Sequence, residues 1–186
     1  MTARLVVLAS GSGSTLQAVL DAAAGPDFPA EVVAAGTDRP GCPAMARAES
    51  AGIPTFSLAL PDYTSRAEWD AALAAELARH RPDLVVLAGF MRVIAAGTVE
   101  AYSMVNTHPS LLPSFPGAHA VRDALAHGVK VSGVTVHRVD AGLDSGPILA
   151  QAAVEVRPDD TEQSLQERIQ VVEKPLYVEA IRQLCR

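Results

Sequence analysis

Two side chains that could do chemistry stand two residues apart in the segment Asn106-Thr107-His108. Side chains with this spacing lie on the same side of an extended chain, so Asn106 and His108 are expected together at a strand end. A carboxamide can donate a hydrogen bond to a developing oxyanion, and an imidazole can move protons near neutral pH. The pair favours acyl-type transfer, whereas a histidine taken alone more often makes a structural hydrogen bond.

The turn Gly142-Leu-Asp-Ser-Gly146 carries a third group, the carboxylate of Asp144. An aspartate in such a turn usually bonds its own backbone. The functional alternative is that Asp144 pairs with a histidine, for which His108 is favoured and His119 and His137 are weaker candidates. A serine hydrolase triad is not supported, because the sequence has no G-x-S-x-G motif. We therefore expect the nucleophile to come with the substrate.

The loop Ser10-Gly-Ser-Gly-Ser-Thr15 lies between a predicted strand and a predicted helix. Its two glycines allow a ligand to approach the backbone, and the helix N-terminus that follows attracts an anion. Leu16 stands where a dinucleotide fingerprint has its third glycine, and the loop has no Walker lysine. A single phosphomonoester is therefore expected here, with a helix cap at Ser14 or Thr15 as the structural alternative.

The remaining pattern alternates short strands with helices. Three runs are continuously apolar, as in parallel strands covered on both faces: residues 5–8, 32–35 and 84–87. After about residue 130, two strands over 131–139 and 148–156 follow each other without a helix. The sequence therefore predicts an α/β fold: an open, mostly parallel Rossmann-like sheet with helices on both faces and an antiparallel C-terminal addition. We expect one domain over residues 1–186.

Four unusual segments follow directly on predicted strand ends. Besides the Gly/Ser loop they are residues 89–94, 106–109 and 140–146. Because open α/β sheets bind ligands at the carboxyl ends of their strands, we expect these segments to share one edge of the sheet.

Composition excludes several classes of protein. The net charge of −6 argues against gripping nucleic acid by its phosphates. No apolar run approaches the roughly 20 residues that span a bilayer, and the N-terminus does not read as a signal peptide. The two cysteines fit no metal or redox spacing. We expect a cytoplasmic protein with no metal, no membrane contact and no nucleic-acid partner; a homodimer stays open.

Four motifs in order carry a resemblance over about residues 5–180. They are Leu87-Ala-Gly-Phe-Met-Arg92, Asn106-Thr-His-Pro-Ser-Leu-Leu-Pro113, Phe115-Pro-Gly117 and Leu143-Asp-Ser-Gly-Pro147. Together they resemble the phosphoribosylglycinamide formyltransferase family. The resemblance implies transfer of a formyl group from the co-substrate 10-formyltetrahydrofolate to the amine of glycinamide ribonucleotide, in purine biosynthesis and without a metal.

The resemblance also implies a role for each matching residue. The catalytic residues would be Asn106, His108 and Asp144. The ribonucleotide would be bound by Gly13, Ser14, Thr15 and Glu173. The folate would be bound by Arg66, Met91, Arg92, Val93, Ile94 and Asn106. Two positions depart from the family pattern, since Thr15 stands where the family often has Asn and Thr107 where it usually has Ile.

The implied mechanism is direct attack of the substrate amine on the formyl carbon. Asn106 and protonated His108 would stabilise the oxyanion, with protons moving through His108 or water, and Asp144 would favour the histidine cation. Formyltetrahydrofolate deformylases share the fold, but their motif typically reads His-Ser where Pro109-Ser110 stand. Methionyl-tRNA formyltransferases share the core and add a tRNA-binding domain that we do not expect here. A non-catalytic nucleotide-binding module would explain the loop and the sheet, but not the polar triad.

Overall fold

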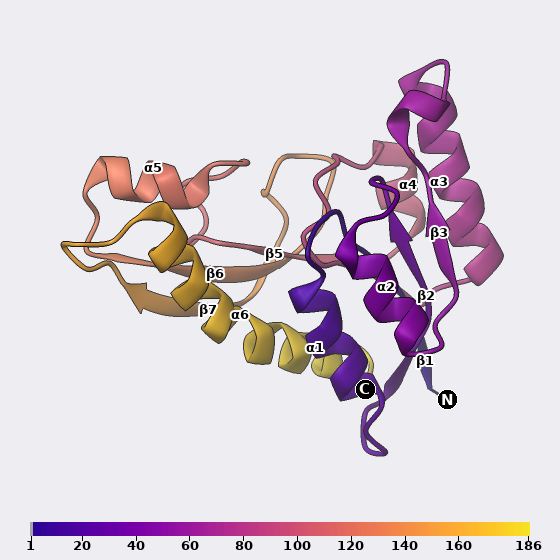
Figure 1. Cartoon of the computed structure of the whole chain (residues 1–186), viewed down its shortest axis with the longest axis horizontal. Coiled ribbons are helices and arrows are strands. Elements are labelled where there is room, and N and C mark those ends of the chain that lie inside the picture. The colour runs from indigo at the N-terminus through magenta and orange to yellow at the C-terminus, as the bar shows by residue number, and fades with distance from the viewer. Residues whose placement is uncertain (1) are drawn as a thin grey trace. The chain divides into compact units, whose positions relative to one another are not determined.

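The computed structural model describes residues 2–186, which form one seven-stranded sheet with strand order β3-β2-β1-β4-β5-β6-β7 (Figure 1). The strands are β1 Ala3–Leu8, β2 Ala30–Thr37, β3 Thr55–Ser57, β4 Leu84–Leu87, β5 Met104–His108, β6 Val131–Arg138 and β7 Ile148–Glu155. The helices are α1 Ser14–Ala23, α2 Pro43–Ser50, α3 Arg66–His80, α4 Ala96–Ala101, α5 Ala120–His127 and α6 Glu162–Leu184. A mostly parallel sheet with antiparallel C-terminal strands confirms the predicted fold class.

The chain divides into two compact units. The first comprises the described residues up to Val105 together with residues 182–186, and the second comprises Asn106–Ile181. The single domain over residues 1–186 stays a prediction.

The first unit is built on parallel strands. Strand β1 pairs in parallel with β2 on one side and β4 on the other, and β2 pairs in parallel with β3. Residues 5–8 of β1 are fully buried, as expected for a strand covered on both faces. Helices α1 and α2 pack against each other and against β2 (Figure 1).

Helix α3 begins with a side-chain cap at Ser65 and a second hydrogen bond one residue earlier, a variation on the capping box. The Ser65 hydroxyl accepts a hydrogen bond from the Glu68 backbone N–H, and the Glu68 carboxylate accepts one from the Thr64 N–H. Hydrogen bonds from Thr64 lower the pKa of Glu68. The helix then buries Trp69 together with Leu73 and Leu77.

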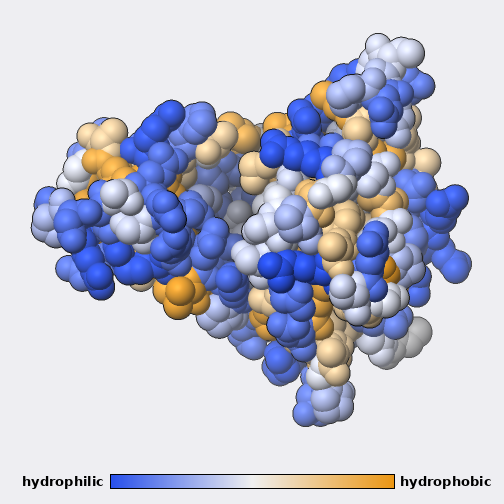
Figure 2. All heavy atoms as spheres, in the orientation of Figure 1, coloured by the Kyte–Doolittle hydropathy of each residue, from blue (hydrophilic) through white to orange (hydrophobic). Residues whose placement is uncertain are grey.

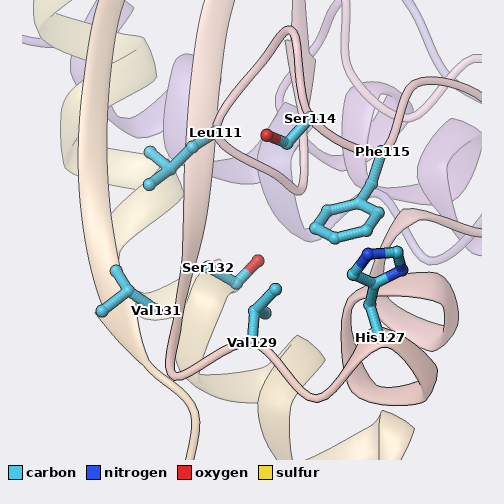
Figure 3. Close-up of a pocket in the computed structure, with 7 residues that line it drawn as sticks. All are labelled: Leu111, Ser114, Phe115, His127, Val129, Val131 and Ser132. Atoms are coloured by element: carbon cyan, nitrogen blue, oxygen red, sulfur yellow. The ribbon is translucent and has the colours of Figure 1, made fainter.

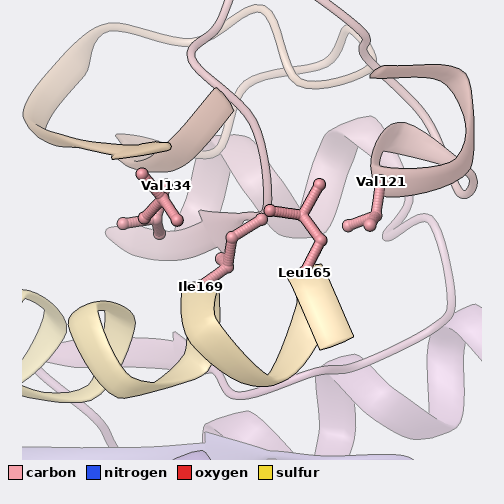
Figure 4. Packing of buried hydrophobic residues seen from close by; sticks show 5 residues of the cluster. Val121, Val134, Leu165 and Ile169 are labelled. Atoms are coloured by element: carbon pink, nitrogen blue, oxygen red, sulfur yellow. The ribbon is translucent and has the colours of Figure 1, made fainter. Parts of the chain in front are cut away.

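The second unit pairs β6 and β7 antiparallel and packs helices against them. Figure 4 shows the core of this packing, where Val121 of α5, Val134 of β6, and Leu165 and Ile169 of α6 come together. At the start of α6, the Arg168 guanidinium pairs with Asp160 and holds the pKa of that carboxyl well below its usual range.

Two threonines of this unit whose hydroxyls are buried allow a matched stability prediction. The Thr135 hydroxyl donates to the Ser110 carbonyl at 2.7 Å and accepts from the Leu112 N–H and the Gln151 amide. The Thr107 hydroxyl is also buried but has no hydrogen-bond partner. Thr135→Val should therefore lower the free energy of unfolding by about 2 kcal/mol or more, because it leaves buried polar groups unpaired.

Thr107→Val should instead raise the free energy of unfolding by about 1 kcal/mol, because it removes only an unpaired hydroxyl. Chemical denaturation of both variants beside the wild type measures the contrast. Equal losses of stability in the two variants would contradict this account of the second unit.

On the face shown in Figure 2, hydrophilic residues predominate and hydrophobic ones form scattered patches. Met91, Val93, Leu143 and Val171 are among the large apolar side chains that stay exposed. None of the helices within residues 2–186 combines the length and the apolar character needed to cross a bilayer.

Candidate active site

The Gly/Ser loop leads from β1 into the N-terminus of α1. Gly13 occupies the N-cap position with φ of 72°, a left-handed conformation that glycine adopts at little cost. The N-cap residue has no side chain, and Ser14 and Thr15 already lie within the helix, so the alternative of an N-cap at Ser14 or Thr15 is wrong. The positive end of the helix dipole at an N-terminus without a side-chain cap suits an anion.

Residues of helix α2 donate hydrogen bonds to the backbone of this loop. The Arg47 guanidinium donates to the Ser12 carbonyl at 2.8 Å, and the Ala44 N–H donates to the Gly11 carbonyl at 3.2 Å. A Cβ added to Gly13 would lie 2.5 Å from the Ala44 Cα, closer than real side chains approach a backbone. The shape of the loop therefore depends on glycine at position 13.

The segment after β4 contains most of the residues predicted to bind folate. The Met91 and Val93 side chains are 61% and 64% exposed, whereas Ile94 is buried. The Arg66 guanidinium donates to the Val93 carbonyl, pairs with Asp70 at 2.9 Å, and lies 4.8 Å from the centre of the Trp69 ring. The structure thus brings Arg66 against this segment, although the two are far apart in sequence.

Arg92 points differently from the exposed residues beside it. Its Nε donates to the carboxylate of Asp38 at 2.7 Å, and the Asp38 side chain is fully buried at the end of β2. The Ser10 hydroxyl donates to the same carboxylate and accepts from the Met91 N–H at 2.9 Å. Sequence reasoning did not single out Asp38. An acidic residue directly after an apolar strand is the signal that could have found it.

In the second unit, Asn106, His108 and Asp144 belong to one polar cluster. The His108 Nδ1 lies 3.4 Å from an Asp144 carboxylate oxygen, and its Nε2 donates to the Phe115 carbonyl at 2.8 Å. Both ring nitrogens of this buried histidine therefore face acceptors. A ring with protons on both nitrogens could donate to the two acceptors at once.

His137 is a member of this cluster that the sequence ranked low. Its Nδ1 donates to the Arg138 carbonyl at 2.8 Å, which leaves Nε2 to accept from the Asn106 amide at 3.4 Å. The same Nε2 lies 3.7 Å from the other oxygen of Asp144. His137 therefore orients the carboxamide of Asn106, and Asp144 lies between the two histidines.

The backbone around Asp144 presents its side chain to the cluster. Asp144 has φ of 52°, and its carboxylate accepts from the Gly117 N–H at 2.8 Å. The hydrogen bonds within the turn that are expected of an aspartate there are made by Asp140 instead. Its carboxylate accepts from the Gly142 N–H and the Ser145 hydroxyl. The functional interpretation of Asp144 is thus consistent with its contacts.

Phe115, which accepts from His108, also lines a pocket of about 370 Å³. The other residues around it are Leu111, Ser114, His127, Val129, Val131 and Ser132. The Phe115 and His127 rings meet edge to face with centroids 5.6 Å apart (Figure 3). Asn106, His108 and Asp144 do not line this pocket, so it lies beside the polar cluster and not at it.

Two further predictions concern α5 and α6. Glu173, expected near the substrate amine, is a buried acid of α6. His119 is exposed at the N-cap of α5, and none of its contacts joins it to the cluster of Asn106, His108 and Asp144. Across residues 2–186, no group of three or more His, Cys, Asp or Glu side chains is arranged to hold a metal ion.

Comparisons with known proteins identify relatives of this chain. The sequence profile described as formyl transferase matches residues 3–181. A phosphoribosylglycinamide formyltransferase of Mycobacterium tuberculosis is 55% identical over 98% of this chain and 85% of its own length. A Bacillus subtilis enzyme of the same name is 39% identical over 97% and 94% of the two chains. The structure of glycinamide ribonucleotide transformylase 1 from Symbiobacterium toebii superposes with a TM-score of 0.96 at 45% identity, covering 99% of this chain and 88% of the other. The chain therefore belongs to the formyl transferase family, among its phosphoribosylglycinamide formyltransferases.

Proposed function

We propose that this formyltransferase moves the formyl group of 10-formyltetrahydrofolate to the amine of glycinamide ribonucleotide, a step of purine biosynthesis. The observation that carries the proposal is the His108 ring, held between the Asp144 carboxylate and the Phe115 carbonyl beside the carboxamide of Asn106. Such a cluster holds a cationic acid and a neutral donor, which suits an oxygen that gains negative charge.

Each member of the cluster has a distinct role in the reaction. Asn106 donates a hydrogen bond to the formyl oxygen as charge develops on it, and His108 stabilises that charge by exchanging one of its present acceptors for the oxygen. When bound, the formyl-folate supplies an electrophilic formyl carbon. The bond from the substrate amine to this carbon forms, the bond to the folate nitrogen breaks, and His108 or water carries the proton from the amine to that nitrogen. Asp144 keeps His108 charged and oriented.

The ribonucleotide is held through its phosphate and its amine. Gly13, Ser14 and Thr15 receive the phosphate at the start of α1, where the helix dipole and the glycine backbone favour an anion. Glu173, a buried acid on α6, accepts from the amine.

The folate is held by the segment after β4. Met91 and Val93 offer exposed apolar side chains, while Arg92 and Ile94 fix the segment from its inner side. Arg66 stands against the Val93 carbonyl, and its guanidinium suits the carboxylate tail of a folate. Asn106 completes the folate contacts.

The partners of the chain are then two small molecules, in the cytoplasm, with no nucleic acid and no membrane surface. A homodimer stays an open alternative.

The decisive experiment measures whether consumption of the formyl-folate depends on the presence of glycinamide ribonucleotide. With purified protein, the absorbance change of a formyl-folate should be rapid only when glycinamide ribonucleotide is present, because the amine is the nucleophile. Steady release of the formyl group at a comparable rate without the ribonucleotide would identify a deformylase-like hydrolase. Binding of the ribonucleotide with no turnover of either kind would identify a non-catalytic nucleotide-binding module.

A further inference from the structure

A buried carboxylate in the first unit has no role in the proposed chemistry. Asp38 follows β2 directly, and its side chain is completely shielded from solvent. A buried charge is costly unless it is paired and hydrogen-bonded. Its partners should therefore show what it does.

Those partners come from two other strand ends. Arg92, after β4, donates to one carboxylate oxygen, and Ser10, after β1, donates to the other. Three neighbouring strands of the sheet, β2, β1 and β4, are thus tied together just beyond their carboxyl ends.

Ser10 extends this connection to two functional loops. Its hydroxyl accepts from the Met91 N–H at 2.9 Å, and its own N–H donates to the Gly89 carbonyl at 3.1 Å. Ser10 also directly precedes Gly11, the first glycine of the loop that leads into α1. One carboxylate therefore contacts, directly or through Ser10, both the segment 89–94 and the loop 11–15.

The segment 89–94 needs such an anchor. The Met91 and Val93 side chains are mostly exposed, so they contribute little packing that would hold the backbone. Its polar contacts are two hydrogen bonds with Ser10, the ion pair of Arg92, and the hydrogen bond from Arg66 to the Val93 carbonyl. The contacts of Ser10 and Arg92 connect the segment to Asp38.

We propose that Asp38 is a positioning residue for both substrate loops. It holds the segment 89–94, the donor segment, through Arg92 and Ser10, and it holds the loop 11–15, the phosphate loop, through Ser10. The proposal rests on the proposed function, which assigns folate to residues 91–94 and phosphate to residues 13–15. Arg92 is consequently committed to Asp38, and the segment recognises the folate through its backbone and its apolar side chains.

The test uses Asp38→Asn and Ser10→Ala in the full chain. Asn keeps the size of the side chain but can accept from only one of its two donors, so the loops should lose their fixed positions. The KM for the formyl-folate should rise about tenfold or more, with a smaller rise for the ribonucleotide. The kcat at saturation should stay near the wild-type value, because the His108 cluster keeps all its contacts.

Two measurements and a control variant keep the result interpretable. Thermal unfolding shows whether the variants are folded at the assay temperature. Emission of Trp69, the single tryptophan of the chain, reports the donor segment without any turnover, because its ring stacks with Phe90 at 6.4 Å between centroids. Glu76→Gln, an acid-to-amide change at an ion pair with Arg79 on α3, is the matched control and should leave both KM values unchanged.

The double variant Asp38→Asn/Arg92→Gln tests whether Asp38 acts through Arg92. If Asp38 acts by holding Arg92, the KM of the double variant should be no worse than that of the worse single variant. Unchanged KM values in folded Asp38→Asn and Ser10→Ala would overturn the positioning role and leave Asp38 a stabilising residue only. A wild type without ribonucleotide-dependent turnover would instead overturn the proposed function. In that case unchanged Trp69 emission in both variants would overturn the positioning role as well, and altered emission would support it.

Discussion

Asp144→Asn is expected to lower kcat on the order of 10²-fold or more, while the KM for glycinamide ribonucleotide changes little. The carboxylate lies between His108 and His137, at 3.4 Å and 3.7 Å from their ring nitrogens. An amide of the same shape removes the negative charge that faces the His108 ring. The loss should fall on the chemical step, because the proposed phosphate site is a different segment, the Gly/Ser loop.

The substitution is well suited to a kinetic test. Asn tolerates the left-handed backbone of position 144, where φ is 52°, and its side-chain oxygen can still accept from the Gly117 N–H. Asp140→Asn in the same turn is the matched control, since Asp140 bonds only Gly142 and Ser145 among its observed partners. Steady-state kinetics should be combined with NMR of the His108 ring nitrogens, which report whether both carry protons.

A near-normal kcat in Asp144→Asn, with an unchanged His108 ring, would show that Asp144 is only a turn residue. Asn106→Ala should reproduce the kcat effect by a different route, through loss of the amide donor. An effect of the same size in Asp140→Asn would mean that the turn as a whole, and not the Asp144 charge, is what catalysis needs.

Elements with a continuously apolar, fully buried run were predictable from the sequence, and short elements without such a run were not. Residues 5–8 and 84–87 are continuously apolar because parallel strands are covered on both faces, and both are strands in the structure. Strand β3 has three residues and helix α4 has six. Neither is long enough to show a clear hydrophobic period, which is why the pattern gave no sign of them.

The candidate site also combines residues that could be grouped from the sequence with contacts that could not. Asn106 and His108 could be grouped from sequence because one strand end presents residues two apart on the same side. The pairing of Asp38 with Arg92 spans 54 positions and depends on where β2 and β4 stand relative to β1 in the sheet. His137 joins the cluster from β6 in a similar way. Contacts of this kind are set by strand order and register, which local spacing does not encode.

The second large effect is expected at the Gly/Ser loop. Gly13→Ala should raise the KM for glycinamide ribonucleotide on the order of 10²-fold, because small misplacements of a binding group have effects of this size. Two causes act together. The left-handed φ of 72° is unfavourable for alanine, and the new Cβ would lie 2.5 Å from the Ala44 Cα. Since α2 cannot yield there without moving its backbone, the loop itself must shift.

Gly52→Ala separates these causes. Gly52 has a similar φ of 73°, but a Cβ at this position meets nothing within 4 Å. The control should therefore lose some stability from backbone strain and keep the wild-type KM for both substrates. Kinetics with each substrate varied in turn make the comparison, and the KM for the formyl-folate should rise much less in Gly13→Ala than the KM for the ribonucleotide. Equal rises for the two substrates would place the phosphate elsewhere, because a loop that binds only the ribonucleotide has no reason to weaken both.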